Sequence, residues 1–149
     1  MRFLFVDEIR ELIPGRYIQA ATHVPADAPF FRDHFPGFPV VPGVLLTEMM
    51  AQTAGKCFDA ERRPRGKAML AQIRRASFRR WVGPGATALI RAEVTADRDR
   101  YGTAAAHIEV EGNRICAADL FFTFLPLAQL AGDYRDAVLE GFLARRSPC

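Results

Sequence analysis

The sequence predicts an α+β fold in which one buried helix packs against an antiparallel sheet. Residues 44–58 are apolar on nearly every side of a helix, and a helix without a wide polar face is buried. Six other segments have the length and the apolar pattern of strands, and turn signals rich in Gly, Pro, Asn or Asp separate most of them. A central helix with several antiparallel strands is typical of the α+β class.

Two strands are expected before the helix. Residues 3–9 are predicted to form a strand or a short apolar edge, which Asp7 and Glu8 end. Pro14-Gly15 is a turn signal, and residues 16–24 then alternate well enough to predict a second strand. The next five residues begin and end with proline and are expected to form a loop.

Four strands are expected after the helix. Residues 61–67 form a charged connection, for which a solvated loop is the preferred interpretation. The strands themselves are predicted at residues 68–80, 87–96, 101–110 and 114–125, and the last two form a hairpin. The whole chain, residues 1–149, is predicted to be a single domain. Residues 126–149 are expected to be a C-terminal extension, because the apolar residues from Tyr134 to Leu143 have the spacing of an amphipathic helix.

The composition limits the class of function. The 149 residues suit one domain with one core, and half of them are apolar. With 20 basic and 17 acidic residues the formal charge is +3, which is too weakly basic for a dedicated nucleic-acid binder. No segment approaches the length of a membrane span, so no membrane partner is expected. The three cysteines are an odd set without CxxC spacing, which predicts reduced thiols and a cytoplasmic location.

The loop before the helix is the first feature that points to a function. Three prolines between residues 36 and 42 fix φ and remove backbone donors, so the loop is stiff and holds His34 in one place. Pro42 and Gly43 lie where the helix begins, and the first N–H groups of a helix have no intrahelical partner. Those groups and the positive end of the helix dipole suit a developing oxyanion.

The helix carries two polar anomalies, Glu48 and Gln52, one turn apart on one face. A buried carboxylate is costly unless it is paired or keeps its proton. A protonated acid in an apolar site can give that proton to a leaving group. Gln52 has two interpretations that the sequence leaves open, since it either orients Glu48 or forms a hydrogen bond inside the core.

The loop and the helix together contain the pattern HFPGxPxxPGVLxxExxAQ, which runs from His34 to Gln52. This pattern resembles the 3-hydroxyacyl-[acyl-carrier-protein] dehydratases of the FabZ type, in the wider FabA/FabZ group. A weaker similarity extends from Phe3 to about Leu125, and it includes the segment of residues 76–85.

The resemblance implies a hotdog fold, in which a curved antiparallel sheet wraps around a long central helix. It implies His34 as the catalytic histidine and Glu48 as the catalytic acid, which meet across the interface of a homodimer with shared active sites. A higher oligomer is left open. The glutamate at position 48, where an aspartate would be the alternative, resembles the branch that dehydrates without isomerising.

The implied activity is dehydration of (3R)-3-hydroxyacyl thioesters on acyl carrier protein to trans-2-enoyl thioesters, in fatty-acid or related polyketide or polyene biosynthesis. This reaction needs a base near C2 and an acid near the C3 hydroxyl. Histidine, with an ordinary pKa of about 6.5, suits the first role. Beyond His34 and Glu48, five residues are predicted to bind substrate or the oxyanion: Pro42, Gly43, Val44, Gln52 and Phe38.

No cofactor is expected beyond the phosphopantetheine arm that carries the substrate, and no metal, because His34 and Glu48 lack a third ligand at a familiar spacing. Acyl carrier protein is the expected partner. The arginines at positions 62, 63, 74, 75, 79 and 80 form either a patch for this acidic partner or plain surface charge, with equal support for both.

Two other functions remain open from the sequence. The first is a hotdog thioesterase that uses Glu48 as a base toward water. The second is a non-catalytic module that binds an acyl carrier. The presence of both His34 and Glu48 argues against the second, because a binding module needs neither an acid nor a base.

Overall fold

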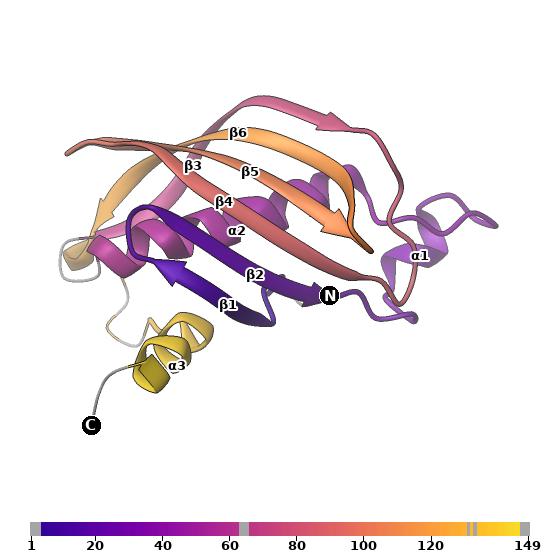
Figure 1. Ribbon diagram of the computed structural model, residues 1–149, viewed down its shortest axis with the longest axis horizontal. Helices are drawn as coiled ribbons and strands as arrows, with labels where there is room; N and C mark the ends of the chain where they lie inside the picture. Colours follow the sequence, from indigo (N-terminus) through magenta and orange to yellow (C-terminus); the bar gives the residue numbers. More distant parts are fainter. Residues whose placement is uncertain (1–3, 63–65, 131, 133, 147–149) are drawn as a thin grey trace.

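The computed structural model describes residues 4–62, 66–130, 132 and 134–146. Six antiparallel strands form one sheet in the order β1-β2-β4-β5-β6-β3. Their bounds are β1 Glu8–Ile13, β2 Tyr17–His23, β3 Gly66–Phe78, β4 Thr87–Asp97, β5 Tyr101–Val110 and β6 Asn113–Pro126. The helix α2, Gly43–Arg62, lies along the inner face of the curved sheet, and the strands arch over it (Figure 1). The predicted α+β class and its wrapped helix are therefore confirmed.

The core forms between α2 and the sheet. Of the 15 residues from Leu45 to Asp59, all are buried except Glu48 and Gln52, which are half-buried. Phe58 packs against Phe122 of β6, with ring centroids 5.3 Å apart. A Cβ at Gly102 of β5 would lie 2.5 Å from the Phe58 ring, so only glycine allows this close approach of helix and sheet. The helix therefore has one open stripe, and that stripe contains its two polar anomalies.

The prediction of a strand at residues 3–9 is wrong. Residue 3 lies outside the described residues, residues 4–7 form no strand, and β1 begins at Glu8, where the strand was expected to end. The backbone groups of Phe5 are bound by side chains instead of by a neighbouring strand: its N–H donates to Gln52 Oε1 at 2.9 Å, and its carbonyl accepts from Thr22 Oγ1. Phe5 and Val6 of the apolar run are therefore buried in the core without forming a strand.

The other predicted elements are present with small changes of boundary. The strand predicted at residues 101–110 matches β5 at both ends, and α2 extends beyond the predicted helix to Arg62. A one-turn helix, α1 Phe30–Asp33, precedes the loop and was not predicted. None of the helices in the described residues is long and apolar enough to cross a membrane.

The C-terminal segment contains a 3-10 turn, η1 Leu127–Gln129, and the helix α3, Ala137–Arg146. Asp136 caps α3, since its Oδ1 accepts from the Leu139 N–H at 3.1 Å. At the other end of α3, Arg146 donates to the Leu12 carbonyl of β1 at 2.6 Å. This places α3 beside β1, at the end of α2 that is far from the histidine loop (Figure 1).

Candidate active site

The histidine loop is held in place from both sides. The His34 N–H donates to the Phe30 carbonyl of α1 at 2.9 Å, and the Val41 N–H donates to the Val82 carbonyl at 2.8 Å. Between these anchors the backbone turns sharply, with positive φ of 58° at Phe35 and 84° at Gly37. A non-glycine residue in this region is strained, and such strain persists only where the surroundings impose it. The loop therefore has one imposed shape that positions His34.

The position of the His34 ring favours one tautomer. Its Nδ1 lies 3.3 Å from the Val40 carbonyl oxygen, and a carbonyl can only accept. In the neutral ring Nδ1 therefore carries the proton, which leaves the lone pair on Nε2. The half-buried ring is also in contact with the Phe35 ring, with centroids 4.5 Å apart. In this arrangement Nε2 is the nitrogen that can accept a proton.

The start of α2 lies directly after the loop. Its first helical hydrogen bond runs from the Leu45 N–H to the Pro42 carbonyl at 2.9 Å, so the amides of Gly43 and Val44 precede it. Val44 is 76% exposed. The Phe78 ring of β3 packs closely on Gly43: a Cβ at this position would lie 3.3 Å from the ring. The N–H groups of Gly43 and Val44 therefore lie before the first hydrogen bond of the helix, beside the Phe78 ring.

Glu48 lies one turn further along the open stripe of α2 and is held by Gln52. Gln52 Nε2 donates to Glu48 Oε1 at 2.9 Å, while Gln52 Oε1 accepts from the Phe5 N–H at 2.9 Å. The contacts that both interpretations of Gln52 require are therefore present, one to Glu48 and one to the backbone of the buried Phe5. Glu48 was expected to be buried, but it is half-buried, because the stripe that carries it is uncovered in the single chain.

The single chain does not bring His34 and Glu48 together. Among the described residues no hydrogen bond or ion pair joins the two, and each has the separate partners given above. Phe38 lies on the loop and is 57% exposed. The predicted binding residues Pro42, Gly43 and Val44 are contiguous at the helix start, whereas Phe38 belongs to the preceding loop.

Comparison with known proteins defines the family. The model of the FabA-like domain matches residues 1–119. The chain belongs to the FabA-like family. It is 37% identical to a 3-hydroxyacyl-[acyl-carrier-protein] dehydratase FabZ of Listeria innocua over 128 residues, which cover 85% of this chain and 89% of that protein. A protein of the same name from Syntrophomonas wolfei is 36% identical and covers 80% of this chain and 84% of its own length.

Solved structures of low identity share the fold of this FabA-like chain. The dehydratase heterocomplex ApeI:P from Xenorhabdus doucetiae has a TM-score of 0.70 at 16% identity and covers 85% of this chain and 86% of that one. The Escherichia coli PaaI protein has a TM-score of 0.66 at 13% identity, covering 79% and 78%. PaaI is a hotdog-fold protein, so the predicted hotdog fold is confirmed.

The C-terminal region lies outside the residues that match the FabA-like model, and a buried charge cluster attaches it to α2. Lys56 lies one turn beyond Gln52, and its Nζ forms an ion pair of 2.7 Å with Asp136, the cap of α3. The two side chains are only 8% and 12% exposed. The extension thus covers the continuation of the stripe that carries Glu48 and Gln52.

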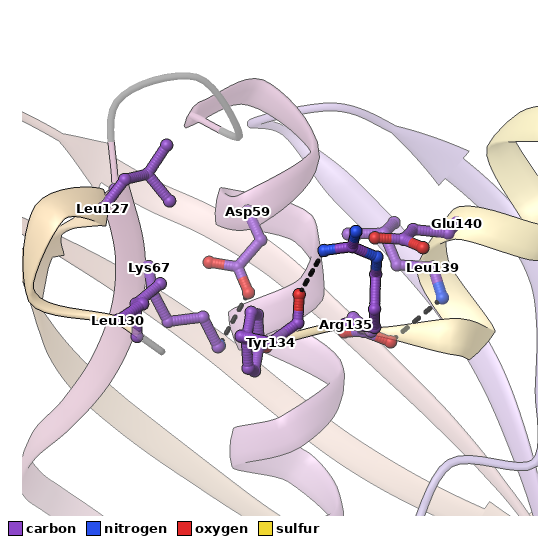
Figure 2. A pocket seen from close by; sticks show the side chains of 10 residues that line it. Asp59, Lys67, Leu127, Leu130, Tyr134, Arg135, Leu139 and Glu140 are labelled. Atoms are coloured by element: carbon purple, nitrogen blue, oxygen red, sulfur yellow. Dashed lines mark hydrogen bonds and ion pairs between the residues drawn. The ribbon is translucent and has the colours of Figure 1, made fainter. Parts of the chain in front are cut away.

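A second pair, buried at Asp59 and half-buried at Lys67, lines a cavity of about 180 Å³ next to the first. Asp59 of α2 pairs with Lys67 of β3 at 2.6 Å, and Leu127, Tyr134 and Leu139 close the cavity from the extension (Figure 2). Burial raises the pKa of the Asp59 carboxyl, while the neighbouring Lys67 ammonium opposes that rise. Lys67 belongs to the connection that was predicted to be solvated, and for this residue the prediction is wrong, because it reaches back to the end of the helix.

Replacing Lys56 with methionine is expected to lower the free energy of unfolding by about 3 kcal/mol, since it leaves the buried Asp136 carboxylate without its partner. The double variant Lys56→Met/Asp136→Asn keeps the cap of α3 and removes the stranded charge, so it should recover at least half of the loss. Denaturant unfolding measures both. A single variant as stable as the parent would show that the pair does not hold the extension.

Sequence reasoning missed the residues that connect distant segments at this site. Thr22, Phe5 and Asp136 each bind a partner at least 17 positions away, and no local pattern signals such contacts. No group of three or more His, Cys, Asp or Glu residues able to hold a metal ion occurs in the part of the chain that the structure describes.

Proposed function

We propose that the chain dehydrates (3R)-3-hydroxyacyl thioesters on acyl carrier protein to trans-2-enoyl thioesters, in fatty-acid or related biosynthesis. The observation that carries the proposal is 37% identity to a dehydratase over a span that covers 85% of this chain. The geometry supports it, because a stiff loop carries a histidine with an available Nε2 and a helix presents a carboxyl group on its open stripe.

The mechanism divides the work between two side chains. His34 Nε2 takes the proton from C2 of the substrate, and the amides of Gly43 and Val44 stabilise the charge that develops on the thioester oxygen. Glu48, as a neutral acid, gives its proton to the C3 hydroxyl, which leaves as water while the double bond forms between C2 and C3. His34 ends as imidazolium and Glu48 as carboxylate, and transfer of one proton from His34 to Glu48 through solvent restores both.

A spectroscopic assay of enoyl formation tests this function with 3-hydroxyacyl carriers of several chain lengths. We expect an enoyl product and no free thiol. Release of free thiol without enoyl product would identify a thioesterase instead. Tight binding of acyl carriers without any turnover would identify a binding module.

We propose a homodimer in which each site combines His34 of one protomer with Glu48 of the other. Three exposed apolar side chains, Phe35, Phe38 and Val44, lie on the histidine loop and at the start of α2. Large exposed apolar patches mark interfaces. A second copy over this surface would cover the half-buried stripe of α2 and bring a second histidine loop toward Glu48.

The sheet edges support the same arrangement. Arg146 of α3 donates a hydrogen bond to a backbone carbonyl of the edge strand β1. The other edge strand, β3, is exposed along its length from Met69 to Phe78. A long open edge strand with exposed Met69, Leu70 and Ile73 is a template for pairing with another chain. We therefore place the dimer contact along β3, next to the start of α2.

The carrier protein is proposed to dock on the segment that follows β3. Arg79, Arg80 and Trp81 line a hollow together with Glu111 and residues of the β5–β6 hairpin. Trp81 is 69% exposed. This segment comes directly after Phe78, whose ring packs on Gly43, so a carrier bound here would deliver its arm next to the helix start. Arg63 of the predicted patch lies outside the described residues.

The double variant Arg79→Glu/Arg80→Glu is expected to raise KM for carrier-bound substrate about tenfold and leave kcat nearly unchanged, because rim charges act on encounter with an acidic partner. A short thioester without a carrier should be turned over as before. The matched control, Arg98→Glu/Arg100→Glu in the β4–β5 turn, makes the same change of charge elsewhere. An equal rise of KM in that control would assign the effect to net charge alone.

We also propose a cytoplasmic location. Cys57 and Cys116 are buried free thiols, and burial raises their pKa to about 11 and about 12. Such thiols are structural and inert, which suits a reducing compartment.

A further inference from the structure

A chain of three hydrogen bonds connects the sheet to Glu48. Thr22 of β2, only 3% exposed, donates its hydroxyl to the Phe5 carbonyl. The Phe5 N–H donates to Gln52 Oε1, and Gln52 Nε2 donates to Glu48 Oε1, both at 2.9 Å. The chain crosses from the sheet through the N-terminal segment to α2. We call Thr22, Phe5 and Gln52 the relay.

The relay has a fixed direction. A backbone N–H can only donate, so the Gln52 amide must turn its oxygen toward Phe5. Its nitrogen then faces Glu48 and can only donate to it. The opposite orientation of the amide would place an NH₂ group against the Phe5 N–H and would lose both bonds. The position of one backbone amide therefore decides which way Gln52 points.

This direction has a consequence for the acid. Glu48 Oε1 accepts from Gln52, so in the neutral acid Oε1 is the carbonyl oxygen and Oε2 carries the proton. A carboxyl group without such a neighbour can carry its proton on either oxygen. The relay thus selects Oε2 as the oxygen that delivers the proton, and the proton lies on the side of the carboxyl group away from Gln52.

Thr22 is the rigid end of the relay. It lies within a strand that pairs on both sides, with Thr22 opposite Ala88 of β4 and Ala21 opposite Glu8 of β1. The N-terminal segment is not part of a strand at Phe5. Two further hydrogen bonds attach Asp7, two positions later, to β2: the Asp7 N–H donates to the Ala21 carbonyl at 3.0 Å, and the His23 N–H donates to Asp7 Oδ2 at 2.6 Å. The Thr22 hydroxyl is a direct bond from β2 to Phe5 itself.

We infer that Thr22 is a positioning residue for the general acid: it holds Phe5 so that Gln52 orients the Glu48 carboxyl group. This inference rests on the proposed function, because it takes Glu48 as the acid. Thr22 acts only through Phe5 and Gln52, so its removal should slow the chemical step and leave substrate binding nearly unchanged.

The test removes one buried hydroxyl and compares it with another. Thr22→Val keeps the branched shape and loses the donor to Phe5. Thr53→Val is the matched control, since the Thr53 hydroxyl is also buried and donates to a carbonyl, that of Met49 at 2.8 Å, but takes no part in the relay. We expect Thr22→Val to lower kcat about tenfold with KM within about twofold of the parent value. Thr22→Ser should restore kcat, and Thr53→Val should leave it unchanged.

A second measurement needs no substrate. The side-chain amide NMR signal of Gln52 in the free protein should move in Thr22→Val and stay in place in Thr53→Val. A parent protein that forms no enoyl product would contradict the proposed function, whereas an unmoved Gln52 signal would contradict the relay. The two failures are therefore distinguishable.

Two further outcomes would overturn the inference. Equal loss of kcat in Thr22→Val and Thr53→Val, or failure of Thr22→Ser to restore it, would show that the hydroxyl acts through stability alone. If Thr22→Val does not fold, Gln52→Met is the variant that tests the relay. Methionine keeps the length of the side chain but cannot accept a hydrogen bond from the Phe5 N–H or donate one to Glu48. Unchanged kcat in Gln52→Met would then end the proposal.

Discussion

His34→Ala is expected to lower the rate of enoyl formation by about three orders of magnitude, because proton abstraction by a positioned base contributes about 10²–10⁴-fold. The reason lies in the loop. Its anchors at both ends and the bond from Nδ1 to Val40 direct one ring nitrogen, and alanine removes that nitrogen without altering the backbone. The measurement is kcat for enoyl formation with a 3-hydroxyacyl carrier.

The control for this variant is His107→Ala. His107 lies on the outer face of the sheet, where it pairs with Glu109 at 3.2 Å. Burial and the nearby Arg114 lower its pKa, so it is a mostly neutral structural histidine. Its removal should leave kcat within about twofold of the parent value. A His34→Ala variant as active as this control would exclude His34 as the base.

The elements that could be predicted from the sequence are those whose signal is local. The hairpin of β5 and β6 follows from alternation on both sides of Glu111-Gly112-Asn113, and the turn indeed has positive φ at Glu111 and Gly112. The presence of α2 and its burial follow from its apolar surface, although the helix continues past residue 58 to Arg62. Between Leu45 and Asp59 the two half-buried residues are the predicted anomalies, Glu48 and Gln52. In each case neighbours within a few positions determine the outcome.

The features that could not be predicted depend on distant partners. The apolar run at residues 4–6 has the composition of a strand, yet Phe5 is bound by side chains 17 and 47 positions away. The extension is held by Lys56 and Asp136, which are 80 positions apart. Neither hydrophobic period nor turn chemistry contains this information, because both describe one segment at a time.

The candidate site shows the same division. His34 and Glu48 were selected from the sequence as the reactive pair by a resemblance, and the structure gives each a defined neighbour, Val40 for one and Gln52 for the other. No hydrogen bond joins His34 to Glu48 among the described residues of the single chain. Their meeting stays a prediction about two chains, which a mixing experiment can decide.

Glu48→Gln is expected to reduce kcat by about 10²–10⁴-fold, since an amide has no proton to give to the leaving hydroxyl. The substitution is nearly isosteric. Gln52 can still donate to the oxygen of residue 48, so the fold and the stripe should persist. Glu11→Gln on the exposed face of β1 makes the same chemical change away from the site and should have no effect on kcat. Unfolding curves that coincide with the parent would show that the loss is chemical.

Mixing the two inactive variants should restore activity if the sites are shared. In a heterodimer of His34→Ala with Glu48→Gln, one site has lost both groups, but the other combines the intact His34 of the second protomer with the intact Glu48 of the first. Random association makes half of the dimers mixed, so about one quarter of the sites should be active. The two variants, co-expressed with different affinity tags and purified through both, should approach half of the parent activity per dimer. If each chain instead held a complete site of its own, every site in the mixture would lack one group, and co-expression would restore nothing.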